Sequence, residues 1–372
     1  MAFKHRLWSV FLALAGALTL SAGAAGKSEA PTEPSRFAVW NPDENRVSEQ
    51  GAARIRAYLE KHKSASFLVI YKGKIAFQYG DIHKKHLIHS MRKPLLSILY
   101  GQALSEGQIA LDEPLSGLGL EEPNAAFTES EGRASVEQLL QSRSGVYLPA
   151  AAETEAMTKA RPARGSHEPG EQYYYNNWSF NSLGTLFEQR TGTGIFEAFE
   201  DQLAKPLGMI DYAGVIGDLE ITDEAQALKD MAGLDGYYSR EPERSRHPAY
   251  HFRLSAHDLA LIGQLLVQGG QWNGQTLVDP AWIKRSTQCA SVLNPDIGGG
   301  RSLCYGLMWR VIQSDNKTTA FMHTGLGAHM IYVYPSAELV LIHRADTENP
   351  DYVRSGSPQA LIGLTFGAFS AS

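Results

Sequence analysis

The stretch "LIHSMRKPLL" (residues 87–96) places Ser90 and Lys93 three positions apart in a mostly apolar run. The apolar pattern continues to Leu104 with almost no polar face, which predicts a buried helix that ends at Gly107. Residues at positions i and i+3 share one face of a helix, so the serine and the lysine would be neighbours. A lysine in such a place is costly unless its charge is used or its pKa is lowered.

Two interpretations of this pair remain open from these residues alone. A desolvated lysine can remove the proton of a neighbouring serine, which is otherwise a weak nucleophile. Alternatively, Ser90 is an ordinary helix cap and Lys93 extends to solvent. A second serine and lysine have the same spacing, Ser314 and Lys317 in "SDNK" (314–317), which lies between two β patterns. Although Ser-Asp-Asn also occurs in penicillin-interacting enzymes, four small polar residues in this position predict a hairpin turn.

Two further motifs follow the Ser90 motif in order. "PGEQYYYNNWSFNSLG" (169–184) contains two overlapping Tyr-x-Asn triplets, and His-Thr-Gly occupies residues 323–325 in a late strand pattern. With these motifs the chain resembles the serine β-lactamase and DD-peptidase superfamily, in particular its class C-like branch. That branch also contains serine esterases and 6-aminohexanoate-dimer hydrolases. The Pro-Gly before and the Leu-Gly after the triplets match the family frame, which selects Tyr175 and Asn177.

The resemblance implies a serine hydrolase that forms an acyl-enzyme on an amide or ester bond, with no cofactor and no metal. The implied roles are nucleophile for Ser90, proton transfer for Lys93 and Tyr175, substrate binding for Asn177, His323, Thr324 and Gly325, and backbone N–H oxyanion donors for Ser90 and Leu326. Whether Lys93 or Tyr175 is the general base stays open. The acidic deacylation residue of class A enzymes has no counterpart in the matched motifs.

His323 departs from the lysine that is usual at this position in class C enzymes, which points away from an efficient β-lactamase. An unperturbed histidine titrates near pH 6.5, so its cation could hold a substrate carboxylate in mildly acidic solution. The competing interpretation is a neutral His323 that only makes hydrogen bonds within the site.

Two functions from different classes are compatible with these motifs. One is turnover of a small-molecule or short-peptide amide or ester. The other is a penicillin-binding-like protein or pseudoenzyme that binds peptidoglycan stems without efficient turnover. The intact motifs favour the enzyme, but they do not identify its substrate. A net charge of −6 gives no basic excess for nucleic acid, and nothing in the sequence indicates an oligomeric state.

The order of the patterns predicts an α+β fold. Helical spacing at 48–63, a hairpin signal at 66–80, late strands and a closing apolar helix indicate an antiparallel sheet flanked by N- and C-terminal helices. The stretch at roughly 108–300 has mostly helical pattern broken by glycine and proline, which predicts an inserted all-helical lobe. The resemblance implies the β-lactamase/penicillin-binding-protein-like transpeptidase fold. The expected division is a signal peptide at 1–24, a linker at 25–40 and a hydrolase domain at 41–372, with a sheet lobe at 41–107 and 301–372 and a helical lobe at 108–300.

The first 24 residues combine a short positive region, an apolar run and small residues at Ala22-Gly23-Ala24, as in a cleaved secretory signal. The apolar run is too short to span a bilayer comfortably, so we expect a periplasmic or secreted protein with no stable membrane anchor after cleavage. Such a compartment favours a disulfide between Cys289 and Cys304, although two free thiols remain an alternative.

Two other groups of residues attract attention. His83, His86 and His89 are spaced by three and could meet on a helix as metal ligands, but no carboxylate or cysteine accompanies them, so we expect no metal site. Tyr173, Tyr174 and Trp178 could form a substrate wall or could equally serve in packing.

Overall fold

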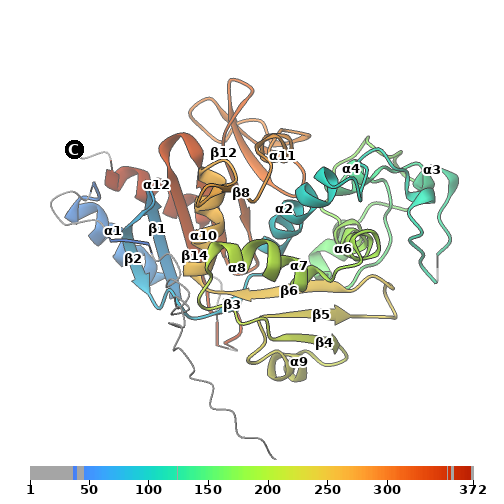
Figure 1. Ribbon diagram of the computed structural model, residues 1–372, viewed down its shortest axis with the longest axis horizontal. Helices are drawn as coiled ribbons and strands as arrows, with labels where there is room; N and C mark the ends of the chain where they lie inside the picture. Colours follow the sequence, from blue (N-terminus) through green and yellow to red (C-terminus); the bar gives the residue numbers. More distant parts are fainter. Residues whose placement is uncertain (1–36, 40–45, 124, 350, 353–355, 370–372) are drawn as a thin grey trace, which may run out of the picture. The chain divides into compact units, whose positions relative to one another are not determined.

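An antiparallel sheet of eight strands organises the chain, in the order β2-β1-β14-β13-β12-β11-β10-β9 (Figure 1). The computed structural model describes residues 37–39, 46–123, 125–349, 351–352 and 356–369, so the predicted signal peptide lies outside the described residues. The strands are β1 (Ser66–Tyr71), β2 (Lys74–Gly80), β9 (Ser291–Asn294), β10 (Arg301–Tyr305), β11 (Arg310–Ser314), β12 (Lys317–Thr324), β13 (Met330–Tyr334) and β14 (Leu339–Arg344).

Two tight turns set the register of this sheet. Lys72 and Gly73 join β1 to β2 with φ angles of 49° and 72°. Asp315 and Asn316 join β11 to β12 with φ angles of 50° and 57°. Two successive positive φ angles match the right-handed twist of a hairpin. The predicted hairpin at 66–80 is therefore confirmed, and so is the interpretation of "SDNK" as a turn.

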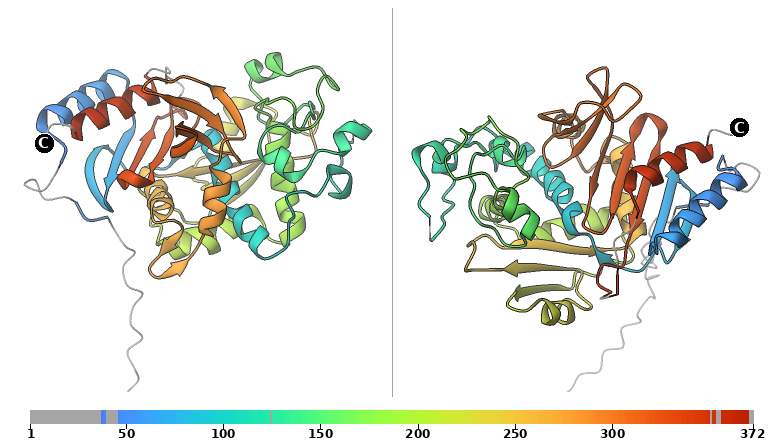
Figure 2. Two further views of the ribbon diagram at one scale, coloured as in Figure 1. Left: turned by 90° about the horizontal axis from the view of Figure 1, so that it is seen from above. Right: turned by 180° about the vertical axis from the view of Figure 1, so that it is seen from behind.

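Helices cover both faces of the sheet. On one face, α1 (Glu49–Lys61) and α12 (Pro358–Phe369) lie side by side (Figure 2). Their contact is close, because a Cβ at Gly51 would lie 2.4 Å from the Cβ of Ala368. On the other face α10 (Ala256–Val267) is buried almost all round and packs against β1, β13 and β14. These two layers bury the sheet between them and hold its strands in place.

The remaining elements lie mostly in the middle of the sequence. The helix that follows the Ser90 turn is α2 (Arg92–Ser105). The other helices are α3 (Glu129–Gly132), α4 (Val136–Leu140), α5 (Glu155–Ala160), α6 (Asn177–Thr191), α7 (Ile195–Phe199), α8 (Lys205–Leu207), α9 (Glu224–Asp230) and α11 (Pro280–Ser286). Short turns of helix are η1 (His89–Met91), η2 (Leu115–Gly117), η3 (Glu200–Ala204) and η4 (Pro335–Ala337), and a small hairpin joins β7 (Gln271–Trp272) to β8 (Gln275–Thr276).

The α+β class with its antiparallel sheet is confirmed, but the middle segment differs from the expected all-helical lobe. It contains most of a second sheet, ordered β3 (His86–Leu87), β6 (Ala249–Leu254), β5 (Gly236–Arg240) and β4 (Ile216–Glu220). In β6 every second side chain is buried, the period of a strand. Moreover β9 and α10 pack with the main sheet although both lie within 108–300. The boundaries of the two lobes therefore stay a prediction.

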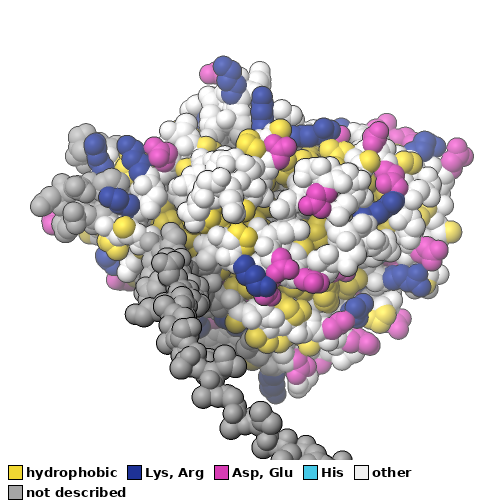
Figure 3. Space-filling view, viewed as in Figure 1, with side chains coloured by type: hydrophobic (Ala, Val, Ile, Leu, Met, Phe, Trp, Pro, Cys, Tyr) yellow, Lys and Arg dark blue, Asp and Glu magenta, His cyan; other side chains and the backbone are white. Residues whose placement is uncertain are grey.

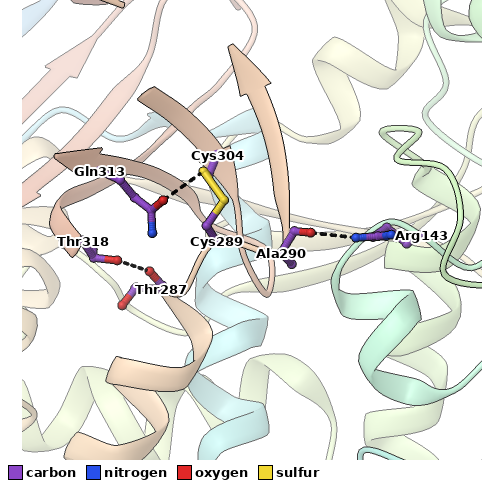
Figure 4. Close-up of a disulfide and its surroundings, with 7 residues drawn as sticks. All are labelled: Arg143, Thr287, Cys289, Ala290, Cys304, Gln313 and Thr318. Atoms are coloured by element: carbon purple, nitrogen blue, oxygen red, sulfur yellow. Dashed lines mark hydrogen bonds between the residues drawn. A yellow bond between two sulfur atoms is a disulfide. The ribbon is translucent and has the colours of Figure 1, made fainter. Parts of the chain in front are cut away.

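A disulfide joins Cys289 to Cys304, as the sequence predicted (Figure 4). It connects the segment after α11 to β10, and the Cα atoms of the two residues are 5.3 Å apart. Thr318 at the start of β12 donates a hydrogen bond to the carbonyl of Thr287 nearby, at 2.8 Å. Both contacts fix the segment after α11 to the main sheet, one at β10 and one at β12.

Charges of both signs are interspersed over the face shown in Figure 3, with no broad basic patch there. Among the described residues, no helix is both long and apolar enough to cross a membrane.

Candidate active site

Ser90 lies in the short turn η1, between β3 and the first residue of α2. Its neighbour His89 has a φ of 50°, in the left-handed region that few residues other than glycine adopt. The His89 ring is held by a 2.8 Å hydrogen bond between Nε2 and the Thr347 hydroxyl. Strained backbone of this kind is concentrated at functional sites, where it fixes the direction of one side chain. Here it directs the backbone into the turn that carries Ser90.

Lys93 is almost completely buried, with 1% of its surface exposed, and its Nζ lies 3.3 Å from Ser90 Oγ. Burial lowers the pKa of Lys93 well below its ordinary value, and the positive charges of Arg92 and Arg310 lower that pKa further. Each cause disfavours the ammonium form. The amine beside Ser90 can therefore be neutral and can accept a proton.

Tyr175 and Phe180 present their rings to the same amine. Lys93 Nζ lies 4.7 Å from the centre of the Tyr175 ring and 4.9 Å from that of Phe180. Burial raises the pKa of Tyr175 to about 12, although the nearby Ser90 hydroxyl and Arg310 oppose this rise. Tyr175 is therefore a phenol near neutral pH. The ring faces would stabilise an ammonium once Lys93 has taken up a proton.

Tyr174 points elsewhere. Its hydroxyl donates a 2.8 Å hydrogen bond to the carbonyl of Met157. The structure thus brings the tyrosine chosen from the family frame, Tyr175, to Lys93. This orientation follows from the start of α6, where the Asn176 side chain caps the helix by accepting a bond from the N–H of Trp178.

Asn177, at the first position of α6, is buried behind this tyrosine. Its side-chain nitrogen donates a 2.7 Å hydrogen bond to the carbonyl of Ala152, and its Oδ1 is buried without a hydrogen-bond partner among the described residues. It makes no described hydrogen bond to Lys93. The resemblance implies that Asn177 holds either the substrate amide or Lys93, and which of the two it binds stays a prediction.

The third motif lies at the end of β12. A Cβ at Gly325 would lie 2.5 Å from the carbonyl oxygen of Ile88, so only glycine allows the strand end to approach the Ser90 turn this closely. A hydrogen bond of 2.9 Å from the Gly325 N–H to the His329 carbonyl closes the turn that follows. Leu326, the expected second oxyanion donor, has 55% of its surface exposed within that turn.

His323 is fully buried, with its Nδ1 3.0 Å from the carbonyl of Thr324. Burial lowers the pKa of His323 well below 6.5, and the charge of Arg310 acts in the same direction. Its Nε2 is buried without a partner among the described residues, and its ring centre lies 6.3 Å from that of Tyr175. These observations favour a neutral His323 that makes hydrogen bonds within the site over a cationic His323 that holds a substrate carboxylate.

A cavity of about 730 Å³ opens beside the Ser90 turn. Its lining includes Leu326 and His89 from the segments around the Ser90 turn, and three carboxylates. Its lining does not include Ser90, Lys93 or Tyr175. The acidic lining residues are Glu153, Glu241 and Glu348.

The other groups singled out in the sequence do not join this site. The three histidines of the 83–89 segment have different partners. His83 contacts Asp211, and His89 contacts Thr347. His86 lies near Asp346 and Glu348. Trp178 is buried and donates a hydrogen bond to Glu122. Tyr173 packs against Tyr305 with ring centres 5.1 Å apart. Packing therefore accounts for Trp178 and Tyr173 better than a substrate wall does.

Three residues near Lys93 were not predicted from the sequence. Arg92 is buried, with its guanidinium 4.3 Å from the centre of the Tyr250 ring and a 3.0 Å hydrogen bond to Asn181. Arg310 begins β11, next to β12 with its His-Thr-Gly motif, and Phe180 lies one turn into α6. Arginine directly before Lys93 in an apolar run was a visible signal. Arg310 and Phe180 had none, because only the folded chain brings them to Lys93.

The comparisons with known proteins agree with this geometry. The chain belongs to the beta-lactamase family. The model of that family, described as Beta-lactamase, matches residues 52–361. No curated protein matches it in sequence. Among solved structures it is similar to a protein described as a 6-aminohexanoate-dimer hydrolase from Bacillus anthracis, with a TM-score of 0.60 and 17% identity over 90% of this chain and 87% of that one.

Two further structures share the fold. One is a penicillin-binding protein homologue from Caulobacter crescentus, with a TM-score of 0.56 and 17% identity over 87% of this chain and 98% of that one. The other is a family VIII carboxylesterase, with a TM-score of 0.58 and 16% identity over 89% of this chain and 99% of that one. The transpeptidase-like fold implied by the sequence motifs is thereby confirmed.

Proposed function

We propose that the protein is a serine hydrolase that forms an acyl-enzyme through Ser90 on a small amide or ester. The observation that carries this proposal is the contact of 3.3 Å between Ser90 Oγ and the buried amine of Lys93. A serine hydroxyl is a weak nucleophile until a base takes its proton. A lysine without access to water, beside two arginines, is suited to be that base.

In the proposed acylation, neutral Lys93 accepts the Ser90 proton while Oγ attacks the substrate carbonyl carbon. The new ammonium lies over the rings of Tyr175 and Phe180. The tetrahedral oxyanion would accept hydrogen bonds from the N–H groups of Ser90 and Leu326. The close contact between Gly325 and Ile88 brings these two segments together.

The leaving group needs a proton when the tetrahedral intermediate collapses. Tyr175 is suited to donate it, because its raised pKa keeps it a phenol. Lys93 can then return its proton to the tyrosine oxygen. In deacylation, water attacks the acyl carbon, loses a proton to the same pair and releases the acid, and Ser90 regains its hydrogen. Asn177 Oδ1 would accept a hydrogen bond from a substrate N–H.

Substrate class and location form the finer part of the proposal. The names of two structural neighbours describe a dimer hydrolase and a carboxylesterase, which supports amides and esters as substrates. Neutral His323 gives no cation for a substrate carboxylate. The signal-like first 24 residues and the Cys289–Cys304 disulfide support a periplasmic or secreted protein.

Covalent labelling tests the proposal directly. The protein should react with a fluorophosphonate, and peptide mapping should find the label on Ser90. The Ser90→Ala variant should not react, whereas Ser314→Ala should react like the wild type. A label that persists in Ser90→Ala would overturn the mechanism. Labelling without turnover of a p-nitrophenyl ester, nitrocefin, a D-Ala-D-Ala peptide or an aminohexanoate dimer would favour a binding protein.

A further inference from the structure

Three side chains far apart in the sequence meet outside the Ser90 site. His83 lies in the connector between β2 and β3, Asp211 in the loop after α8, and His257 in the first turn of α10. Each offers a ligand atom, and these atoms all lie within 4.8 Å of one another. The Nδ1 of His83 is 3.1 Å from Oδ2 of Asp211.

His257 is held in the orientation of a metal ligand. Its Nδ1 lies 3.0 Å from Oδ1 of Asp258, and only 4% of its side chain is exposed. A carboxylate beside Nδ1 places the ring hydrogen there and leaves a lone pair on Nε2. That Nε2 is buried with no hydrogen-bond partner among the described residues. A buried acceptor without a partner is rare and needs an explanation.

Asp258 also positions the loop that carries Asp211. Its carboxylate accepts hydrogen bonds from the backbone N–H groups of Ile210, Asp211 and Tyr212, at 3.2, 3.1 and 2.9 Å. One buried carboxylate thus fixes both the ring of His257 and the backbone of Asp211. Carboxylates of this kind, one step behind the ligands, are a regular part of metal sites.

We propose that His83, Asp211 and His257 bind one Zn²⁺ ion. Two imidazoles and a carboxylate are a common zinc donor set, with bonds of about 2.0–2.1 Å, which puts tetrahedral ligand atoms roughly 3.3 Å apart. The His83–Asp211 distance of 3.1 Å is close to this spacing. A plain hydrogen bond between His83 and Asp211 would explain that contact but would leave His257 Nε2 without a partner.

The site is accessible to a fourth ligand. The His83 side chain is 48% exposed and that of Asp211 15%. A cavity of about 310 Å³ is lined by His83 and His257 together with Phe37 and Asp81. Water can therefore complete the coordination from this side.

A second cluster of similar composition makes a useful contrast. His86 lies 3.6 Å from Asp346 and 3.9 Å from Glu348, but both carboxylates are already paired with cations. Lys84 reaches Asp346 at 3.0 Å, and Arg253 reaches Glu348 at 2.6 Å. These charges would repel a metal ion. Asp211, in the part of the chain that the structure describes, pairs with no lysine or arginine.

A zinc ion here would join three segments without touching the reacting atoms of the Ser90 site. One of these segments is the connector that leads through β3 into η1. The ion would therefore stabilise the fold and would not take part in hydrolysis. Because it binds only the folded chain, it would raise the unfolding temperature.

The test uses untagged protein treated with EDTA and then titrated with Zn²⁺, and separately with Co²⁺ as a spectroscopic probe. We expect one Zn²⁺ per chain, a visible Co²⁺ spectrum of tetrahedral type, and a zinc-dependent rise in the unfolding temperature. His83→Ala and Asp211→Asn should each weaken Zn²⁺ binding at least tenfold, because even the loss of a residue behind the ligands costs about 10–100-fold in affinity. They should also lose the thermal shift.

Two controls complete the experiment. His167→Ala removes another partly exposed histidine, and Asp346→Asn alters the second cluster; neither should change the affinity. The proposal is overturned if the wild type binds no stoichiometric Zn²⁺, or if His83→Ala and Asp211→Asn bind it as tightly as the wild type. It is also overturned if Asp346→Asn alone loses the ion, because the metal would then occupy the other cluster. Hydrolytic activity plays no part in this decision.

Discussion

The pattern Ser-x-x-Lys occurs twice in the chain, and the two copies lie in opposite surroundings, one buried and one at the surface. Ser90 and Lys93 lie at the start of a buried helix with the side chains 3.3 Å apart. Ser314 and Lys317 face each other across the β11–β12 turn, where Lys317 is exposed to solvent. Spacing alone therefore does not make a reactive pair. What differs is water: burial lowers the pKa of Lys93 well below its ordinary value, whereas Lys317 is exposed to solvent.

Removing each lysine in turn should give the largest difference between the two pairs. Lys93→Met keeps the length of the side chain but removes the base, and we expect kcat/KM for a p-nitrophenyl ester to fall by roughly 10²–10⁴-fold, the scale of general acid–base groups. Lys317→Met should change it less than about twofold, since exposed surface substitutions have small effects. Equal losses in the two variants would contradict the assigned roles. Circular dichroism would show that both variants fold.

The two adjacent tyrosines extend the comparison to the proton donor. Tyr175→Phe keeps the ring below Lys93 but removes the phenol, so turnover should fall by about 10²-fold or more. Tyr174→Phe loses only the hydrogen bond to Met157 and should have a mild effect on the same assay. If the larger loss came from Tyr174→Phe, the choice of Tyr175 within the motif would be wrong.

These contrasts show what the sequence could predict. The order of three short motifs was enough for the fold class. The family frame on both sides of Tyr175 also selected that residue, and the structure places its ring against Lys93. The "SDNK" turn was predictable from its own residues, since turn chemistry is local. The pair of cysteines was recognised from the expected oxidising compartment.

Contacts between distant segments could not be predicted in this way. Asp211 is 128 residues from His83, so the sequence around the histidines shows no carboxylate partner. Arg310 reaches Lys93 only through the pairing of β11 with β12. The strands of the second sheet are short and lie among helices. In β6, "AYHFRL", the alternation of buried and less buried side chains covers only a few residues, so it did not predict a strand within a segment of mainly helical pattern.

Gly325 offers a smaller but more specific effect. Gly325→Ala puts a Cβ 2.5 Å from the Ile88 carbonyl oxygen, and the strand end must move away from the Ser90 turn. A shift of the oxyanion donors by part of an ångström should lower kcat roughly 10–100-fold, with a lesser effect on KM. Gly363→Ala on α12 is the matched control, because no described atom lies within 4 Å of that Cβ. Unchanged kinetics in Gly325→Ala would argue against Leu326 as an oxyanion donor.

The smallest effect concerns Arg310, which lowers the pKa of Lys93 without being its main cause. In the proposed mechanism the base is neutral Lys93, so activity should be lost as pH falls through the pKa of that amine. Arg310→Gln removes a positive charge, so the ammonium becomes less unfavourable and the pKa of Lys93 rises. Arg310 also lowers the pKa of Tyr175, so the pKa of the phenol should rise as well. Both limbs of the kcat/KM profile for a neutral ester should therefore move to higher pH.

Arg301→Gln, which removes an exposed arginine from β10, should leave the profile in place. A profile that moved to lower pH in Arg310→Gln would show that the acid limb does not belong to Lys93, and the case for a desolvated lysine base would fail with it.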